Sequence, residues 1–165
     1  MDWAYFDRME IEDFNKLKEI NEDLKWFTKL ERNTLFDRID IEATDRKGRR
    51  VNIELKTRII SIDKYDTIYI EEDKYKHLIM KWENDGEIPL YINFFNGGIV
   101  GVWDLRKFPD PELKNVTIIN KGRQTIENVN RYILPVEGCS KLGRGDECRY
   151  CIMREREKNN GERTI

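Results

Sequence analysis

The stretch of sequence that decides the fold is LFDRIDIEATDRKGRRVNIELKT, residues 35–57. On either side of the turn DRKGR, apolar and polar residues alternate with a period of two, which predicts two β-strands, 35–43 and 50–57, joined as a hairpin. If Asp40 and Glu54 point to the same face, the simplest register places residue 40 opposite residue 54. Lys56 then shares their polar face, and the other face is entirely apolar: Ile39, Ile41, Ala43, Val51, Ile53 and Leu55.

The two opposed acids on this hairpin indicate a cation site. Opposed side chains begin about 5 Å apart at Cβ, and like charges in that position destabilise a hairpin unless a cation lies between them. Mg²⁺ prefers oxygen ligands and uses few protein carboxylates, so that positions stay open for water and phosphate. Asp40 and Glu54 are therefore candidate ligands of Mg²⁺ or Mn²⁺, with Lys56 one pleat further along the same face.

Upstream of the hairpin, the sequence predicts a long amphipathic helix between Glu10 and Glu31. Its apolar residues recur every three or four positions and form one stripe. The stripe consists of Ile11, Phe14, Leu17, Ile20, Leu24, Phe27 and Leu30.

Downstream of the hairpin, a third strand is predicted at 66–71, followed by a helix with Asp73 as its N-cap. This helix ends near Gly86, with Tyr75, Leu78, Ile79 and Trp82 facing inward. Two further strands, 90–95 and 99–105, flank Asn96-Gly97-Gly98, a typical hairpin turn. Beyond Pro111 the pattern weakens, and it predicts only short strands at 116–119 and 132–136.

Composition indicates a single globular domain with a highly charged surface. The chain has 165 residues, of which 39% are hydrophobic and 38% charged, with a formal net charge of −2. We expect one α/β domain over 1–137, a cysteine-containing extension over 138–153 and a charged, flexible tail over 154–165. No apolar stretch is long enough to span a bilayer and the N-terminus lacks a secretion signal, so we expect a soluble, cytoplasmic protein that does not contact membranes.

Asp40, thirteen intervening residues and then Glu54-Leu55-Lys56, placed after an N-terminal helix, resemble the PD-(D/E)XK nuclease superfamily. The segment IELKTR is similar to the Glu-x-Lys strand of its Holliday junction resolvase-like and restriction endonuclease-like members. The resemblance covers roughly residues 10 to 105, although Arg38-Ile39 stands before Asp40 where the family name has a proline. It implies a restriction endonuclease-like αβββαβ core with a mixed central sheet flanked by helices.

The resemblance also implies a function, a metal-dependent endonuclease that hydrolyses phosphodiester bonds in DNA. In that family the acids bind one or two Mg²⁺ ions and the lysine positions or activates the attacking water, roles that would fall to Asp40, Glu54 and Lys56. Domains of this size often cut both strands by pairing two copies, so we also expect a homodimer. One alternative is a catalytically inactive nuclease-fold protein that binds nucleic acid or acts as an assembly subunit; another is a protein-interaction module whose hairpin acids are ordinary surface residues.

Other charged residues extend this candidate site. Many relatives use an acid from the first helix, and Asp13, which falls within the apolar sector of the helical wheel, is our choice, with Glu19 as the alternative. The hairpin turn carries four basic residues suited to contact a phosphate backbone: Arg46, Lys47, Arg49 and Arg50. Lys74 and Lys81 on the second predicted helix are further cations near the site, although a plain surface role is the expectation for each.

Three cysteines lie near the C-terminus as C-x8-C-x2-C, at Cys139, Cys148 and Cys151. The close spacing of the last two is typical of a thiolate knuckle for structural Zn²⁺, which needs four ligands. Only three cysteines are present and the single histidine, His77, is distant in sequence, so a fourth ligand must come from elsewhere. The alternative is that all three are reduced thiols.

Overall fold

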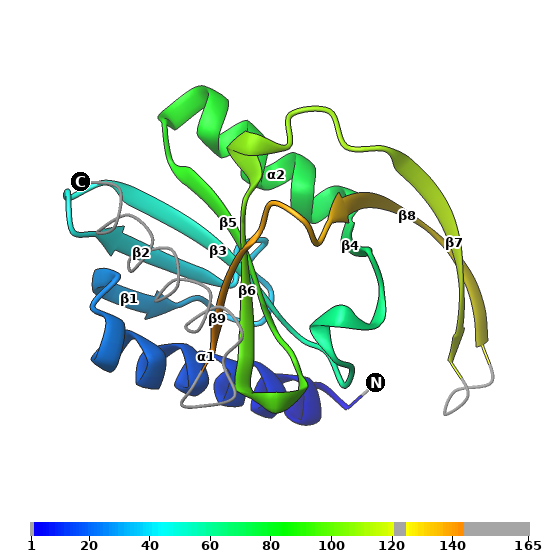
Figure 1. Ribbon diagram of the computed structural model, residues 1–165, viewed down its shortest axis with the longest axis horizontal. Helices are drawn as coiled ribbons and strands as arrows, with labels where there is room; N and C mark the ends of the chain where they lie inside the picture. Colours follow the sequence, from blue (N-terminus) through cyan, green and yellow to red (C-terminus); the bar gives the residue numbers. More distant parts are fainter. Residues whose placement is uncertain (1, 121–124, 144–165) are drawn as a thin grey trace, which may run out of the picture.

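A six-stranded mixed sheet lies between two helices in the computed structural model, which describes residues 2–120 and 125–143 (Figure 1). Its strand order is β1 (Phe27–Arg32), β2 (Ile41–Asp45), β3 (Arg50–Thr57), β5 (Ile88–Phe94), β6 (Ile99–Asp104) and β9 (Ser140–Gly143). β3 and β5 are parallel, and all other neighbours are antiparallel. The helices α1 (Trp3–Leu24) and α2 (Glu72–Asp85) cover opposite faces. The predicted mixed α/β architecture is confirmed, and α1, β1–β3, α2 and β5 form its αβββαβ core.

Side chains alternate across this sheet and form two hydrophobic clusters, one on each face. The cluster under α1 contains the apolar residues predicted for the hairpin, with Ile53 fully buried and Leu17 of α1 packed against them. The cluster under α2 is centred on Trp103, with Tyr75 and Leu78 contributed by the helix. The sheet is therefore buried on both faces, and a polar side chain on either face needs a partner inside the protein.

The β2–β3 hairpin has the predicted register. Glu42 lies opposite Asn52 and Thr44 opposite Arg50, while Asp45 and Arg49 close the turn through a backbone hydrogen bond of 2.9 Å. However, the strand predicted at 35–43 begins only at Ile41. The preceding residues form a loop in which the Thr34 N–H and hydroxyl both donate to Asp37, at 2.7 Å each. Local side-chain hydrogen bonds of this kind compete with strand pairing.

The first helix ends earlier than predicted, because the last residues assigned to it belong to strand β1. α1 ends at Leu24, Lys25 adopts a left-handed conformation with φ of 53°, and the chain returns as β1 along the edge of the sheet. The side chain of Asn21 holds this reversal, since its amide donates to the Phe27 carbonyl and accepts from the Phe27 N–H, at 3.0 and 2.8 Å. Phe27 and Leu30 therefore belong to β1.

A second, three-stranded sheet packs beside α2, in the order β4 (Thr67–Glu71), β8 (Thr125–Pro135) and β7 (Leu113–Asn120). The strand predicted at 66–71 exists as β4, but it pairs with β8 and not with the central sheet. Arg58 joins the two sheets, because its guanidinium donates to the Asn93 amide oxygen, the Tyr69 carbonyl and the Tyr91 hydroxyl, at 2.6, 2.7 and 2.9 Å. The β7–β8 hairpin extends outward from the domain (Figure 1).

α2 follows β4 without a linker, which corrects the predicted cap. Glu71 occupies the N-cap position, and Asp73 lies in the first turn, where its negative charge still favours the helix dipole. Gly86 ends the helix as predicted, with a φ of 71° that suits glycine. Short 3₁₀ turns complete the described elements: η1 (Ile62–Lys64), η2 (Asn96–Gly98) and η3 (Leu105–Lys107). Neither helix in the described residues combines the length and apolar character needed to cross a bilayer.

Candidate active site

Asp40, Glu54 and Lys74 meet at the end of the hairpin opposite its turn. The Lys74 ammonium, from the first turn of α2, lies 3.0 Å from Asp40 Oδ1 and 3.0 Å from Glu54 Oε2. Asp40 precedes β2, and its Oδ2 accepts the Leu55 N–H of β3 at 3.1 Å. The two carboxylates therefore converge on one cation, as the repulsion between opposed acids requires. The sequence indicated the need for this cation but did not identify Lys74 as the group that supplies it.

The electrostatics of the three groups follow from their burial. Their side chains are sheltered, with exposed fractions of 17% for Asp40, 14% for Glu54 and 26% for Lys74. Burial, followed by the negative charge of Asp40, raises the pKa of Glu54 well above its ordinary value, although Lys74 opposes this shift. Burial lowers the pKa of Lys74, but the charges of Glu54 and Asp40 outweigh it and the net shift is upward. Lys74 consequently stays protonated beside the acids.

Two acids of α1 face the same region. Glu10 and Asp13 line a cavity of about 20 Å³ together with Asp40. Burial and the charge of Asp40 raise the pKa of Glu10. The Asp13 Oδ1 atom accepts the Thr57 hydroxyl and lies 3.2 Å from the Lys16 ammonium, so this oxygen already has two partners. Glu10 is the functional candidate that sequence reasoning missed, although its i, i+3 spacing from Asp13 places both acids on one helix face.

Glu19, the alternative first-helix acid, lies elsewhere. It lines a separate cavity of about 440 Å³ between the C-terminal half of α1 and the turn that connects β5 to β6. Asp40 does not line this cavity. Of the two acids considered from the sequence, Asp13 is therefore the one that shares a cavity with Asp40.

Lys56 lies on the α2 side of the sheet, as does Glu54. Both residues line a second cavity of about 20 Å³, whose other polar side chains include Arg58, Tyr91 and Arg131. Lys56 is exposed, whereas Glu54 lies further inside. The predicted polar face is therefore present, with its acid sheltered and its lysine at the surface.

The donor set suits a hard divalent cation. Among residues 2–120 and 125–143, no three His, Cys, Asp or Glu side chains are grouped so that they could hold a metal ion. Mg²⁺ does not require such a group, because one or two carboxylates and several waters complete its shell. Asp40 and Glu54, whose oxygens converge on a single ammonium, fit this requirement, and Glu10 is the next acid available.

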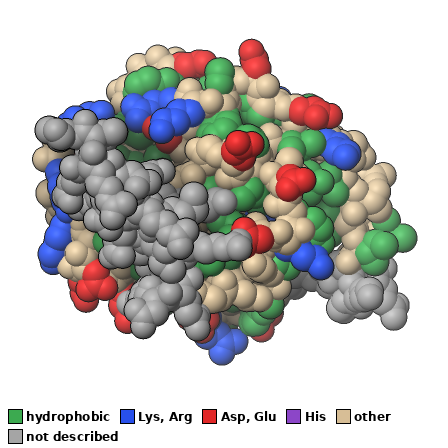
Figure 2. Space-filling view, viewed as in Figure 1, with side chains coloured by type: hydrophobic (Ala, Val, Ile, Leu, Met, Phe, Trp, Pro, Cys, Tyr) green, Lys and Arg blue, Asp and Glu red, His purple; other side chains and the backbone are tan. Residues whose placement is uncertain are grey.

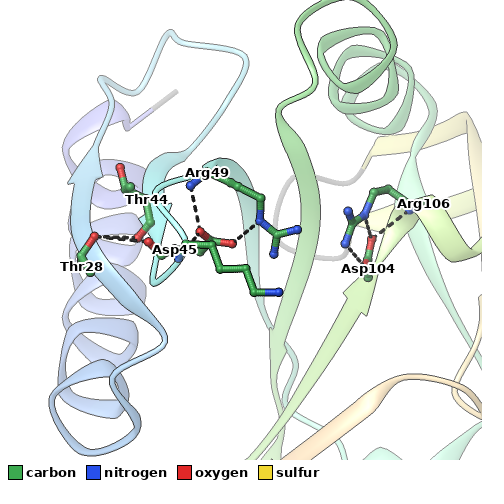
Figure 3. A network of polar contacts seen from close by, with 7 residues as sticks. Thr28, Thr44, Asp45, Arg49, Asp104 and Arg106 are labelled. Carbon is green, nitrogen blue, oxygen red and sulfur yellow. Dashed lines mark hydrogen bonds and ion pairs between the residues drawn. The ribbon is translucent and has the colours of Figure 1, made fainter.

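The basic residues of the hairpin turn are placed differently, and most have partners within the protein. Figure 3 shows one of these contacts, between Arg49 and Asp45. Arg46 donates to the Leu24 and Lys25 carbonyls at the end of α1, Arg49 pairs with Asp45 at 2.7 Å, and Arg50 pairs with Glu87 at 3.3 Å. Lys47 is exposed. Five strand residues separate this turn from Asp40, a distance of about 16 Å. The turn and the acids thus lie at opposite ends of the hairpin.

Side chains of both charges share the described part of the face that Figure 2 shows. Figure 2 shows acidic, basic and hydrophobic side chains interspersed over one face of the molecule. Of the three cysteines, Cys139 is half-buried beside the cluster under α2, and Cys148 and Cys151 lie outside the described residues.

Comparison with known proteins gives similarities to solved structures but none to a family model or a curated sequence. No family model matches the chain, and no curated protein sequence does. Among solved structures, the chain is similar to Hjc, a Holliday junction resolvase from the archaeal hyperthermophile Archaeoglobus fulgidus. The two share 13% sequence identity with a TM-score of 0.47, over 75% of this chain and 84% of the resolvase.

Proposed function

We propose that this chain is a divalent-metal-dependent nuclease that hydrolyses phosphodiester bonds in DNA. The observation that carries the proposal is the convergence of Asp40 and Glu54 on one cation, with each carboxylate 3.0 Å from the Lys74 ammonium. Asp40 directly precedes β2 and Glu54 lies in the neighbouring strand β3, with Lys56 on the same face as Glu54. The same two acids and lysine are the residues that resemble the PD-(D/E)XK motif in the sequence.

Each residue has a distinct role in this proposal. Asp40 and Glu54 would hold the ion, and a bound divalent cation activates water and offsets the negative charge of the phosphate. The Leu55 N–H orients the Asp40 carboxylate. Glu54, which lies 3.0 Å from Lys74 and lines the cavity with Lys56, would orient the attacking water. Lys56, at the mouth of the cavity that Glu54 lines, stabilises the charge that develops on the phosphate.

The direct test is incubation of the pure protein with plasmid, linear and branched DNA in the presence of Mg²⁺, Mn²⁺ or EDTA. We expect cleavage with either metal, none with EDTA, and none for Glu54→Gln in a protein that still melts cooperatively. Mg²⁺ should also raise the melting temperature of the wild type, because it binds the folded state alone. A wild-type protein that neither cleaves nor responds to metal would falsify the proposal.

A second candidate function is a non-catalytic nucleic-acid-binding or assembly subunit with the same fold. The specific observation in its favour is Lys74, whose ammonium already neutralises both acids and occupies the point on which they converge. The Lys74→Met variant separates the two functions. If Mg²⁺ stabilises this variant but not the wild type, and the wild type does not cleave DNA, then Lys74 replaces the metal and the chain is a binding protein.

Two further proposals concern assembly and the C-terminus. A small domain cuts both strands of a duplex by pairing two copies, so we propose a homodimer, which light scattering of the protein with and without duplex DNA tests. We also propose that Cys139, Cys148 and Cys151 contribute to a structural zinc site. Metal analysis of protein purified without added zinc should then give a stoichiometric amount of zinc, which the Cys148→Ser variant should lose without losing cleavage.

A further inference from the structure

The cavity beside Glu54 is built from both sheets. Glu54 and Lys56 come from β3 of the central sheet, while Arg131 comes from β8 of the second sheet. Arg131 lies directly opposite Glu71 of β4 and opposite Lys114 of β7. The second sheet therefore delivers a cationic side chain to the same small cavity as the candidate metal ligand.

Three cations line this cavity, and they differ in how far their hydrogen-bonding capacity is used. Arg58 donates from its Nε and Nη2 atoms in three contacts that join the two sheets. Lys56 and Arg131 form no ion pair with any other residue that the structure describes. The Nε atom of Arg131 is buried and has no hydrogen-bond partner in the described chain. A buried donor without a partner is uncommon and calls for an explanation.

The acids at this cavity do not provide that explanation. Glu54 is committed to Lys74. Glu71 lies opposite Arg131 in the ladder and also lines the cavity, but it forms no ion pair with it. An oxyanion that binds at the cavity would supply the missing partner of Arg131. A guanidinium is suited to this task, because its fork of N–H donors matches the oxygens of a phosphate.

The geometry points to Arg131 as a phosphate-binding residue of the active site, which contacts the DNA backbone beside Glu54 and Lys56. This inference rests on the proposed function, because it takes DNA as the polyanion. It gives the second sheet a functional role, since β8 carries Arg131 and pairing with β4 holds it in register. A phosphate that reaches Glu54 past the exposed Lys56 meets the guanidinium at the same cavity.

The test compares Arg131→Ala and Arg131→Lys with the matched control Lys114→Ala. Lys114 has the same charge and lies directly opposite Arg131 on the same face of the hairpin, but it is exposed and does not line the cavity. We expect Arg131→Ala to lower kcat/KM for DNA cleavage about a hundredfold, Arg131→Lys to restore part of it, and Lys114→Ala to stay within about twofold of the wild type. Thermal melting of each variant reports any loss of fold.

A second measurement separates this inference from the proposed function. DNA affinity is titrated in EDTA, where no cleavage occurs, at several salt concentrations. Arg131→Ala should weaken binding and reduce the slope of log K against log salt by about one relative to Lys114→Ala, because one phosphate contact is lost. If the wild type never cleaves DNA, the proposed function fails and this titration alone decides the role of Arg131. The inference would be overturned if Arg131→Ala and Lys114→Ala had equal affinity and salt slope. An unchanged kcat/KM for Arg131→Ala in a cleaving enzyme would also overturn it. If Arg131→Ala fails to fold, Arg131→Lys and Arg131→Gln are compared with the control instead.

Discussion

The two ends of the β2–β3 hairpin carry similar numbers of charges but use them differently. At the turn, Asp45 accepts the Lys47 and Arg49 N–H groups at 2.9 Å each and pairs with the Arg49 guanidinium, so its charge is matched within the turn. At the other end, Asp40 and Glu54 belong to different strands and depend on Lys74 from α2. The turn is stabilised locally, whereas the open end depends on tertiary packing.

The charges at the turn therefore stabilise the hairpin, whereas those at the open end are available to bind a cation. The cations of the turn pairs are exposed, with exposed side-chain fractions of 50% for Arg49 and 78% for Arg50 against 26% for Lys74, and ion pairs with an exposed partner contribute little to stability. The acids at the open end are sheltered and share one cation, Lys74. Burial of their negative charge costs free energy, and another cation could take the place of Lys74. A site that must exchange cations is expected at the open end, and a rigid connection at the turn.

The largest expected effect contrasts one aspartate at each end. Asp40→Asn should lower DNA cleavage about a thousandfold or more, because it removes a metal ligand and with it the stabilisation of the transition state. Asp45→Asn should leave turnover within a few fold, although it weakens the turn. Single-turnover kinetics at saturating Mg²⁺ provide the measurement. Equal losses in the two variants would show that the whole hairpin, and not its open end, carries the reaction.

The second effect concerns stability without metal. Lys74→Met should lower the free energy of unfolding in EDTA by about 2 to 3 kcal/mol, since it leaves two sheltered carboxylates without their cation. Arg49→Met, which removes the exposed partner of Asp45, should cost less than about 1 kcal/mol. Urea unfolding measures both. Saturating Mg²⁺ should recover much of the loss in Lys74→Met and none of the loss in Arg49→Met, and the absence of that difference would contradict a cation site at the open end.

The third effect is the pH dependence of the metal-free protein. The pKa of Glu54 is raised in the folded state, so protonation of this group favours folding. Its contribution to stability is present in full below the ordinary glutamate value of 4.5 and is lost as the pH rises through the raised pKa. The difference in unfolding free energy between wild type and Glu54→Gln, measured in EDTA, should therefore shift against the wild type between pH 4 and pH 8. A constant difference would refute the burial of this carboxylate.

The sequence was sufficient to predict the hairpin because the signal there is local. Alternation of apolar and polar residues sets the faces, and the five residues from Asp45 to Arg49 set the register. The αβββαβ order was predicted with 66–71 as its third strand, whereas the structure places β1 in the core and 66–71, as β4, in the second sheet. The approach of Asp40 to Glu54 was predictable from the register, although Asp40 precedes β2. The need for a cation between them also followed from Coulomb repulsion alone.

The missed features depend on contacts between residues that are distant in the sequence. Lys74 reaches the acids only because α2 follows β4 directly and packs against the sheet. The end of α1 carries no glycine; Lys25 makes the reversal, and a residue of the distant hairpin turn, Arg46, binds the last carbonyls. The β7–β8 hairpin was underestimated because apolar and polar residues are mixed on both faces of its two strands and do not alternate with a period of two.

The smallest effect tests what the turn itself does, by comparing Arg46→Ala with Lys47→Ala. Arg46 donates to two carbonyls at the end of α1, so its loss should lower the free energy of unfolding by about 1 kcal/mol. Lys47 is exposed, and its loss should leave stability unchanged within about 0.5 kcal/mol.

The effects of the two variants on DNA binding should have the opposite order. If the turn contacts the DNA backbone, Lys47→Ala should reduce the salt slope of binding by about one. Arg46→Ala should have less effect, because the Arg46 guanidinium already donates to the end of α1. Urea unfolding and salt titration of both variants give the four values. A drop in salt slope for Arg46→Ala that equals or exceeds that of Lys47→Ala would mean that Arg46 leaves the helix end to contact DNA, and the turn would then share in substrate binding with the open end.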